Sequence, residues 1–538
     1  MLKRLHTRIY SPLYYDYLRQ NPKISKFLPA LNEINWGDLC NQVQPSSEIH
    51  KKVKILLKEQ NSDLISEQAH RNINSLDKEN AVILITGQQI ALFASPLYTV
   101  YKAITTVKLA EKLNTLNLPF HFIPVFWLES EDHDYREVNH FGIWNQNLTP
   151  VTLFHQGSDR GRTSMRHYKF GNEIMLLISQ LSEMLLDTEF KENLLTLIKD
   201  IYKPGANWVL ATREFLRTLF DDTGLLFFNP GEIQVKHLSA LFFRNMLEDS
   251  HEIARLFSAR TQEIEKVGYQ AQVADISGKA FIHLETEQLQ REHLYRGNGK
   301  FYLKLSQKEL SLEQIQEYLR ETPERFSTSV ISRPLLQSWL LPVVAYIAGP
   351  AEIAYWSQLG SLFEYLKLPM PLVYPRLSAT LVEPKIARFI EKHMPDIENM
   401  PIKMQAFTAS YFKNTASMQD GDPFDQTQKY ILESRKLIGL YLKDIDPTLV
   451  QLGEKTFARI QNQLENLENR SLKAREQKEQ ALSSHLEQIY QAFFPEGQPQ
   501  ERYISIIYFL NKFGLEIFQK INNTLYGDTF EHQILRIK

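Results

Sequence analysis

Cysteine is almost absent from this chain of 538 residues, in which Cys40 stands alone. A single cysteine excludes an intrachain disulfide and a cysteine-rich zinc site, and its scarcity fits a reducing compartment. An excess of one charge is lacking too, because 61 Lys and Arg are balanced by 63 Asp and Glu, for a formal net charge of −2. Composition therefore gives no reason to expect a nucleic-acid partner.

Long hydrophobic runs are also missing. The most apolar one, from Ser338 to Pro350, is too short and too interrupted to span a bilayer. The basic N-terminus is not followed by the apolar stretch that a signal peptide requires. We therefore predict a cytoplasmic protein that has neither a membrane nor a nucleic acid as its partner.

The chain does contain an alternation of short apolar runs and helical patterns. Buried strands that alternate with helices predict an α/β fold with a Rossmann-like, doubly wound parallel sheet. Right-handed crossovers with one reversal give the strand order 3-2-1-4-5, numbered along the chain. The five predicted strands cover residues 81–85, 120–128, 224–230, 339–349 and 371–375.

Two stretches interrupt this alternation and predict insertions into the core. The first insertion has strand patterns near 148–154 and 167–170, and the sequence GNGKFYLKLS in the second predicts a hairpin. The resulting division is an N-terminal helical segment 1–75, core segments 76–145, 206–257 and 326–385, insertions 146–205 and 258–325, an α-helical coiled-coil domain 386–495, and a C-terminal helical segment 496–538 that docks back.

A polar helical region covers residues 425–490, and no Gly or Pro occurs in it beyond Gly453. Phe457, Ile460, Leu464 and Leu467 follow the 3-4-3 spacing of a coiled-coil seam. The highly charged sequence that follows is typical of an exposed antiparallel pair or of a dimer arm. A single long surface helix is the alternative.

Polar residues follow the first predicted strand, in the sequence Thr86-Gly87-Gln88-Gln89. We interpret them as a turn at the carboxyl end of the strand, where α/β sheets bind ligands, although neither GxGxxG nor a P-loop is present. Glycine allows a close backbone approach, and glutamine suits a neutral polar ligand such as a sugar or an amide. A loop that only turns the chain is the alternative. The predicted substrate contacts are Gly87, Gln88 and Gln89, with Tyr98 and Lys102 of the following helix.

The second predicted strand leads into Glu131-Asp132-His133-Asp134. Carboxylates beside an imidazole can orient it and raise its pKa, which makes His133 a candidate general base, with Asp132 and Asp134 as catalytic partners. Glu131 is assigned to substrate binding. The same side chains could bind a divalent ion, or they could form an acidic, solvated loop with one helix N-cap.

A third group of candidates lies where the fourth strand ends and a helix begins. Glu352 in the first helical turn suits the helix dipole, and an aromatic ring at Tyr355 or Trp356 could stack on a purine or a sugar. We therefore predict nucleotide binding by Gly349, Glu352, Tyr355 and Trp356. Packing of the two rings onto the sheet explains them equally well.

Arginine and serine after the fifth strand predict an anion clamp for a substrate, formed by Arg376 and Ser378. Arg333, which precedes a proline, is a further candidate. A buried ion pair would explain this arginine equally well.

Several long stretches carry a resemblance to a known family: ITGQQIALFASPLYTVYKAITTVKLA, PVFWLESEDHDYREVNH, FSTSVISRPLLQSWLLPVVAYIAGPAEIAYWSQL, MPLVYPRLSATLVE and PEGQPQERYISIIYFLNKFG. In this order, they resemble the bacillithiol-biosynthesis cysteine-adding enzyme (BshC) family. The resemblance runs from near the N-terminus to the end of the chain. One departure is the presence of Ala91 and Ala94 where the family pattern has glycine, which restricts the backbone there.

The resemblance implies a Rossmann-type core with connecting-peptide insertions like those of class I aminoacyl-tRNA synthetases, and a coiled coil that makes a homodimer. It implies a ligase that joins the carboxyl of cysteine to the amine of glucosaminyl-malate. Because a carboxylate must be activated before it joins an amine, ATP is the expected co-substrate. Mg²⁺ could accompany ATP, whereas no protein-bound metal and no zinc is expected. No HxGH or KMSKS-like sequence is present, so phosphate must be bound differently from a synthetase.

These candidates combine into a working mechanism. Gln88 and Gln89 bind sugar or malate groups, Arg376 binds a carboxylate, and His133 removes a proton from the attacking amine. If His133 is the base, replacing it by Ala lowers turnover roughly a hundredfold or more. Two other classes stay open: a nucleotidyltransferase-like enzyme that activates another acid, and a synthetase-derived scaffold without turnover.

Overall fold

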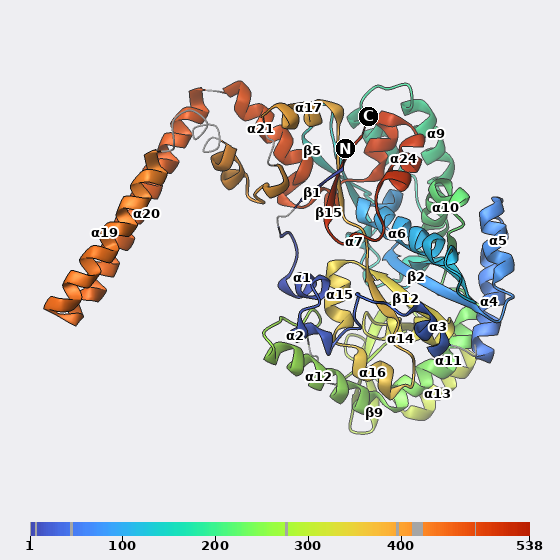
Figure 1. Ribbon diagram of the computed structural model, residues 1–538. Helices are drawn as coiled ribbons and strands as arrows, with labels where there is room; N and C mark the ends of the chain where they lie inside the picture. Colours follow the sequence, from blue (N-terminus) through green and yellow to red (C-terminus); the bar gives the residue numbers. More distant parts are fainter. Residues whose placement is uncertain are drawn as a thin grey trace. The chain divides into compact units, whose positions relative to one another are not determined.

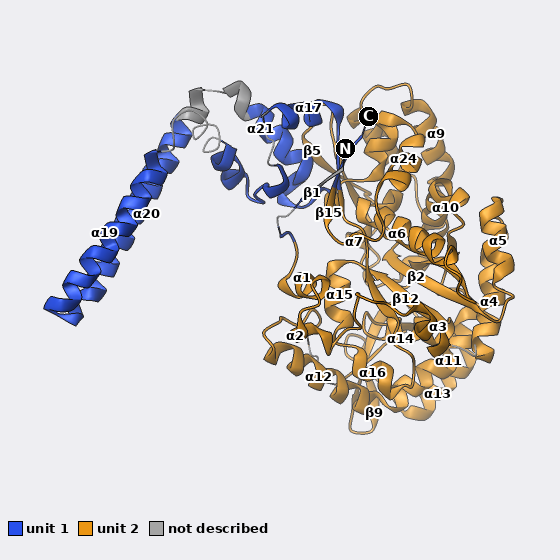
Figure 2. Cartoon of the chain, in the orientation of Figure 1, with its two compact units in different colours: residues 1–9, 380–500, 534–538 blue, residues 10–379, 501–533 orange. Residues whose placement is uncertain are grey.

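The computed structural model describes residues 2–5, 8–43, 47–274, 278–393, 397–411, 423–478 and 480–537. The chain divides into two compact units (Figure 2). Unit 1 contains residues 1–9, 380–500 and 534–538, and unit 2 contains residues 10–379 and 501–533. Among the described residues, no helix has the length and apolar character needed to cross a membrane.

A five-stranded sheet lies at the centre of unit 2 (Figure 1). Every neighbouring pair of its strands is parallel. The strand order, numbered along the chain, is the predicted 3-2-1-4-5, so the doubly wound Rossmann-like sheet is confirmed. In spatial order the strands are β13 (Leu372–Pro375), β12 (Val343–Ala348), β2 (Ala81–Gln89), β3 (His121–Glu129) and β6 (Leu226–Phe228).

The central strand β2 is longer than its apolar run predicts. Residues 81–85 are fully buried, as expected for a strand that is covered on both faces. The strand then continues to Gln89, whose register partner on β3 is Glu129. The turn predicted at 86–89 is therefore wrong, because the ladder with β3 keeps these polar residues extended. Their side chains nevertheless lie at the carboxyl end of the sheet.

The chain reverses after β2 through the short helix η1 (Leu92–Ala94). Ala91 has an ordinary extended backbone, with φ −69° and ψ 153°. Ala94 has a φ of 52°, in the left-handed region that glycine adopts more easily than alanine. The substitution of alanine for glycine is therefore without consequence at position 91 and strains the backbone at position 94.

Helix α6 (Leu97–Asn114) follows and packs on β2 and β3. It is buried along most of its length, including three threonines. Their hydroxyl groups donate to carbonyls one turn earlier, Thr105 to Tyr101 at 2.7 Å and Thr106 to Lys102 at 2.8 Å. The other core helices are α10 (Trp208–Phe220), α11 (Ile233–Glu248), α12 (Ser250–Lys266), α14 (Ser332–Leu340), α15 (Pro350–Trp356) and α16 (Gly360–Tyr365), with η3 (Asp221–Thr223).

The predicted N-terminal segment contributes helices to unit 2. Asn61, at the end of one of them, donates to the carbonyl of Phe227 at 2.7 Å and accepts from its amide at 2.8 Å. This amide side chain covers the free edge of β6 in place of another strand. The helices are α1 (Pro12–Leu18), α2 (Pro22–Ser25), α3 (Trp36–Gln42), α4 (Glu48–Gln60) and α5 (Glu67–Ser75).

Small sheets occupy both interruptions of the core. In the first, β4 (His140–Trp144) pairs with β5 (Pro150–Phe154), and the strand predicted at 167–170 is wrong, because only Lys169 makes an isolated bridge, to Asn207. This region also contains α7 (Tyr135–Val138), η2 (Met165–His167), α8 (Glu173–Met184) and α9 (Lys191–Ile201).

The second interruption forms an antiparallel sheet of order β10-β9-β8-β7-β11. The predicted hairpin is confirmed as the pair β8 and β9. The elements are β7 (Lys279–Glu285), β8 (Arg291–Gly297), β9 (Lys300–Leu303), β10 (Lys308–Leu310), α13 (Leu312–Glu321), η4 (Pro323–Arg325) and β11 (Phe326–Thr328).

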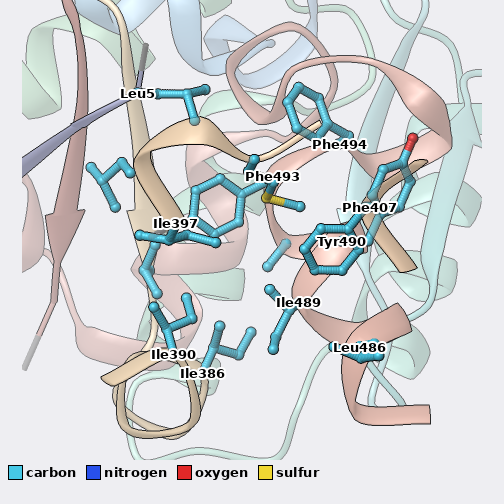
Figure 3. Packing of buried hydrophobic residues seen from close by; sticks show 14 of the residues in the cluster. Leu5, Ile386, Ile390, Ile397, Phe407, Leu486, Ile489, Tyr490, Phe493 and Phe494 are labelled. Atoms are coloured by element: carbon cyan, nitrogen blue, oxygen red, sulfur yellow. The ribbon is translucent and has the colours of Figure 1, made fainter. Parts of the chain in front are cut away.

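Unit 1 has a separate apolar core (Figure 3). Leu486, Ile489, Tyr490 and Phe493 of α21 (Gln480–Phe493) are spaced at i, i+3, i+4 and i+7, so they form one helix face that is buried. The same core includes Ile386, Ala387 and Ile390 of α17 (Pro384–His393), Ile397 of η5 (Ile397–Asn399) and Leu5 of β1 (Leu2–Leu5).

The other elements near the C-terminus are β14 (Ala379–Val382), η6 (Pro495–Gly497), α22 (Gln500–Tyr503), α23 (Ile506–Phe513), α24 (Glu516–Thr524) and β15 (His532–Arg536).

Two long helices, α19 (Pro423–Ile445) and α20 (Pro447–Lys478), form an antiparallel coiled-coil hairpin (Figure 1). Arg435 and Glu454 form an ion pair between them. The predicted coiled-coil domain is thus confirmed, and the single-helix alternative is wrong. The predicted seam is only partly covered within the hairpin, since Phe457 is buried whereas Ile460 and Leu467 are 39% and 58% exposed.

Candidate active site

A cavity of about 560 Å³ lies at the carboxyl ends of β2, β3, β12 and β13 in unit 2. One of its walls comes from the antiparallel sheet of the second insertion. Ligands of doubly wound sheets bind at this edge. The structure brings eleven of the predicted site residues together here: Gly87, Gln88, Gln89, Tyr98, Lys102, Asp132, His133, Gly349, Glu352, Tyr355 and Arg376.

Four predicted site residues do not line this cavity, and each has another role. Glu131 is buried in an ion pair with Lys236. Asp134 caps α7, where its side chain accepts from the amide of Glu137 at 3.2 Å. Trp356 is buried, with its ring stacked on Phe363 at 5.6 Å, and Ser378 is buried and donates to Glu501 at 2.9 Å. The predicted direct ligand contacts of Glu131, Asp134, Trp356 and Ser378 therefore have no support from their positions.

Basic and acidic side chains alternate along the cavity wall, in the order Lys102, Glu352, Arg333 and Glu129. Lys102 Nζ lies 2.5 Å from Glu352 Oε2, and Arg333 lies 3.8 Å from the other oxygen of Glu352. Arg333 also contacts Glu129 Oε2 at 3.2 Å and donates to the hydroxyl of Tyr355 at 2.6 Å. The sequence allowed two interpretations of Arg333, as a site residue or as part of a buried ion pair. Both are correct, because Arg333 lines the cavity and pairs with two carboxylates.

Lys102 organises the end of β2. Its ammonium donates to the carbonyl of Gly87 at 2.7 Å and to Gln88 Oε1 at 2.9 Å. Burial lowers the pKa of Lys102 to about 8, against the opposing effect of the Glu352 carboxylate. Burial alone would raise the pKa of Glu352, but Lys102 and Arg333 hold it below its usual value. At neutral pH this pair is therefore an ion pair that fixes the glutamine-bearing strand end.

The two glutamines are held by their neighbours. Gln88 Nε2 donates to the hydroxyl of Tyr98 at 3.3 Å. Gln89 Nε2 donates to Asp132 Oδ2 at 2.6 Å and also to the carboxylate of Glu137. The amide of Gln89 thus holds two carboxylates together at the rim, beside the end of β3.

His133 lies in the cavity wall with an unexpected electrostatic environment. Its Nδ1 lies 3.0 Å from the guanidinium of Arg291, so Nδ1 accepts the hydrogen bond and the ring proton is on Nε2. Burial, and then the charge of Arg291, lower the pKa of His133 to about 4, although Asp132 opposes the change. The prediction that neighbouring carboxylates raise this pKa is therefore wrong: the imidazole is neutral at pH 7.

Sequence reasoning missed several residues that line the cavity. Glu129 is the last residue of β3 and lies two residues before Glu131, so its position at a strand end was available as a signal. Lys279, His283, Arg291 and His293 come from the second insertion, and no motif in a single sequence predicts that their strands face the core. The remaining missed cation, Arg502, comes from the C-terminal segment, and its guanidinium lies over the ring of Tyr98.

The fold and the cavity define a Rossmann-like α/β protein with a charged, substrate-sized site at the carboxyl edge of its sheet and a coiled-coil arm. Comparison with family models is specific: residues 1–377 match the Bacillithiol biosynthesis BshC, N-terminal Rossmann-like domain, and residues 379–537 match the Bacillithiol biosynthesis BshC, C-terminal coiled-coil domain. The chain belongs to the bacillithiol biosynthesis BshC family.

Several curated relatives share nearly the whole length of this chain. A protein of Chloroherpeton thalassium is 29% identical and covers 98% of this chain and 96% of its own. One of Bacillus cytotoxicus is 26% identical, with 97% of each chain covered, and one of Desulforamulus reducens is 30% identical, covering 87% and 86%. Each bears the name "Putative cysteine ligase BshC".

Proposed function

We propose that this chain is a cysteine ligase of bacillithiol biosynthesis, which joins the carboxyl of cysteine to the amine of glucosaminyl-malate. The observation that carries the proposal is the mixed charge of the cavity in a chain of this family. Lys102 and Arg333 suit the carboxylates of malate and cysteine, whereas Glu129 and Asp132 suit their ammonium groups. A sugar hydroxyl would find hydrogen-bond partners among the polar groups at the end of β2.

ATP is the co-substrate we propose, with Mg²⁺ bound to its phosphates. In the activation step a carboxylate oxygen of cysteine attacks a phosphorus of ATP, which releases pyrophosphate or ADP. The amine then attacks the activated acyl carbon, loses one proton and displaces AMP or phosphate. Gly349 and Tyr355 line the cavity and remain the proposed nucleotide contacts. Mixing the purified protein with ATP, cysteine and glucosaminyl-malate, with an arm lacking ATP, tests both steps by mass spectrometry. Absence of the amide product in the complete mixture would contradict the proposal.

The proton of the attacking amine needs an acceptor, and Glu129 and His133 are the two candidates in the cavity. Burial raises the pKa of Glu129, with Glu131 and Asp132 adding to the effect against Arg333. A carboxylate with a raised pKa is a stronger base than an ordinary one. The tautomer of His133 instead carries its proton on Nε2, which suits a hydrogen-bond donor to a substrate oxygen. We therefore propose Glu129 as the proton acceptor and His133 as a hydrogen-bond donor.

Replacing His133 by Ala is expected to lower kcat/KM by about tenfold or less, the effect of losing one neutral hydrogen bond, and not a hundredfold. Because its pKa is about 4, His133 stays neutral between pH 8 and pH 5.5, so the shape of the pH–rate profile over this range should not change. Steady-state kinetics across that range check both points. His140, which is outside the cavity lining, provides the matched His→Ala control.

Homodimer formation through the coiled coil is also part of the proposal. On α19, Leu437, Leu440 and Tyr441 lie at i, i+3 and i+4 and are 72%, 67% and 65% exposed. An apolar stripe of this kind on a two-helix hairpin is suited to packing against the same stripe of a second copy.

Replacing both Leu437 and Leu440 by Glu is expected to convert a dimer into a monomer, because the charges cannot be desolvated in an apolar interface. Sedimentation velocity over a range of protein concentrations measures the change. Lys443→Glu on the same helix is the control and should remain dimeric. A monomeric unmodified protein, or a dimer that survives both Glu substitutions, would contradict this arrangement.

A further inference from the structure

A cluster of nitrogen-bearing side chains covers the wall of the cavity that belongs to the second insertion. Lys279 and His283 of β7 both line the cavity, although the register between β7 and β8 shifts between them. On the neighbouring strand β8, His293 is the register partner of His283, and Arg291 lies two residues before it. Two adjacent strands of opposite direction thus place four nitrogen-rich groups on one face.

These groups are in direct contact with one another. His283 Nε2 lies 3.2 Å from His293 Nε2, and Lys279 Nζ lies 3.3 Å from the same atom of His293. Arg291 is buried and fixed by a 2.8 Å hydrogen bond to the hydroxyl of Ser327, with a further bond to the carbonyl of Thr328. The arrangement is therefore built into the sheet and does not depend on mobile surface side chains.

The positive charge of this wall is only partly balanced. Asp132 lies 3.7 Å from Arg291. A further cation, Arg162, lies beside it, and its Nε donates to the carbonyl of Arg291 at 3.0 Å. Within the part of the chain that the structure describes, neither Lys279 nor Arg162 contacts a carboxylate. Burial, followed by the nearby cations, holds the pKa of His293 at about 3 and that of His283 well below its usual value. The imidazoles of His283 and His293 are therefore uncharged. They can form hydrogen bonds, and they lie beside cations whose charge is not balanced by carboxylates.

A divalent metal does not fit this cluster. An ammonium group 3.3 Å from an imidazole nitrogen repels a metal at that nitrogen. Among the described residues, no group of three or more His, Cys, Asp or Glu side chains is placed to hold a metal ion. An oxyanion has the opposite preference, because lysine and arginine donate charge-assisted hydrogen bonds to phosphate and carboxylate oxygens.

We propose that Lys279, positioned by its hydrogen bond to His293 and lying beside Arg291, forms an oxyanion subsite that binds the anionic end of a substrate against the second insertion. This proposal rests on the proposed function for the identity of that substrate. The group it takes is a phosphate of the nucleotide or a carboxylate of the malate moiety, which share the chemistry of an anionic oxygen ligand. The insertion thereby becomes part of the substrate site and not only a cover for the core.

Direct binding measurements separate these sources without requiring turnover. Isothermal titration calorimetry of the full chain is run with sodium tripolyphosphate in one arm and malate in the other. The unmodified protein should bind at least one of them, and Lys279→Met should weaken that binding tenfold or more, the loss of a charge-assisted hydrogen bond. Lys279→Arg, which keeps the charge, should restore most of it. Loss confined to tripolyphosphate assigns the phosphate, and loss confined to malate assigns the carboxylate.

Lys300→Met is the matched control, since Lys300 lies on β9 of the same sheet, is outside the cavity lining and pairs with Glu309 at 3.0 Å. It should leave both affinities unchanged. Circular dichroism and thermal unfolding establish that each variant is folded. If neither anion binds the unmodified protein, or if Lys279→Met binds both as tightly as Lys300→Met, the subsite is ruled out. Lys279-dependent anion binding in a protein that fails the ligase assay would disprove the proposed function and leave the subsite standing.

Discussion

Replacement of Glu129 by Gln is expected to lower kcat by about 10² to 10⁴, the usual contribution of a positioned general base. The side chain lies at the end of β3, lines the cavity and is 8% exposed. Arg333 holds its Oε2, which fixes the carboxylate without neutralising it. Glutamine keeps the shape and the contact to Arg333 but cannot accept a proton, so substrate binding should change much less than turnover.

The pH dependence of turnover gives a second measurement of the same role. Because the pKa of Glu129 is raised and the base is the ionised form, activity should fall as the pH is lowered through that pKa. This acid limb should disappear in Glu129→Gln and persist in His133→Ala. Glu364→Gln, an exposed carboxylate on α16, is the matched control. If Glu129→Gln turns over normally while His133→Ala loses a hundredfold, the original assignment of His133 as the base is the correct one.

The fold was predictable because its signals are local and redundant. Each core strand includes a short apolar run next to turn residues or helical patterns, as expected for a buried strand, and crossover handedness then leaves few orders for five strands. The failures have a common physical cause. Gly87 to Gln89 are polar yet remain extended because β3 continues beside them, and pairing with a neighbouring strand is invisible in the local sequence.

The site was predictable as a location but not as a set of interactions. Residues after successive parallel strands meet at one edge, which is why Gln89, Asp132 and Arg376 share a cavity. The electrostatics could not be obtained in the same way. The pKa of His133 is lowered by burial and then by Arg291, which is 158 positions further along the chain and on an antiparallel sheet. Charges from such distant segments decide whether an imidazole is a base or a donor.

Arg376 is the predicted residue whose role the structure changes most. Its guanidinium donates to Glu501 at 2.7 Å and to the carbonyl of Leu377 at 2.7 Å, and the Arg376 and Glu501 side chains are 2% and 0% exposed. Glu501 also accepts from the hydroxyl of Ser378 at 2.9 Å and the amide of Ala379 at 3.0 Å. The proposed carboxylate clamp for a substrate is thus already paired with a carboxylate of the protein.

Replacing Arg376 by Met is therefore expected to lower the free energy of unfolding by about 3–5 kcal/mol, because it leaves Glu501 charged, buried and unpaired. In the unmodified protein the pKa of Glu501 is about 2. Burial alone would raise this pKa, but the effect of Arg376 is larger and lowers it. Since this folded-state pKa is below the ordinary 4.5, the stabilisation is complete above pH 4.5 and is lost as the pH falls towards 2. Urea unfolding at pH 7 and at lower pH measures both effects.

The double variant Arg376→Met/Glu501→Gln separates a structural role from substrate binding. Removing both charges leaves no unpaired ion, so this variant should recover much of the stability that Arg376→Met loses. Arg502→Met is the matched control, because Arg502 also lines the cavity but is exposed, and its loss should leave the free energy of unfolding nearly unchanged. If Arg376→Met unfolds like the unmodified protein but no longer binds glucosaminyl-malate, the structural role is contradicted and Arg376 binds a substrate carboxylate, as the sequence predicted. The charge of Arg376 would then contribute to the free energy of substrate binding and not to the free energy of unfolding.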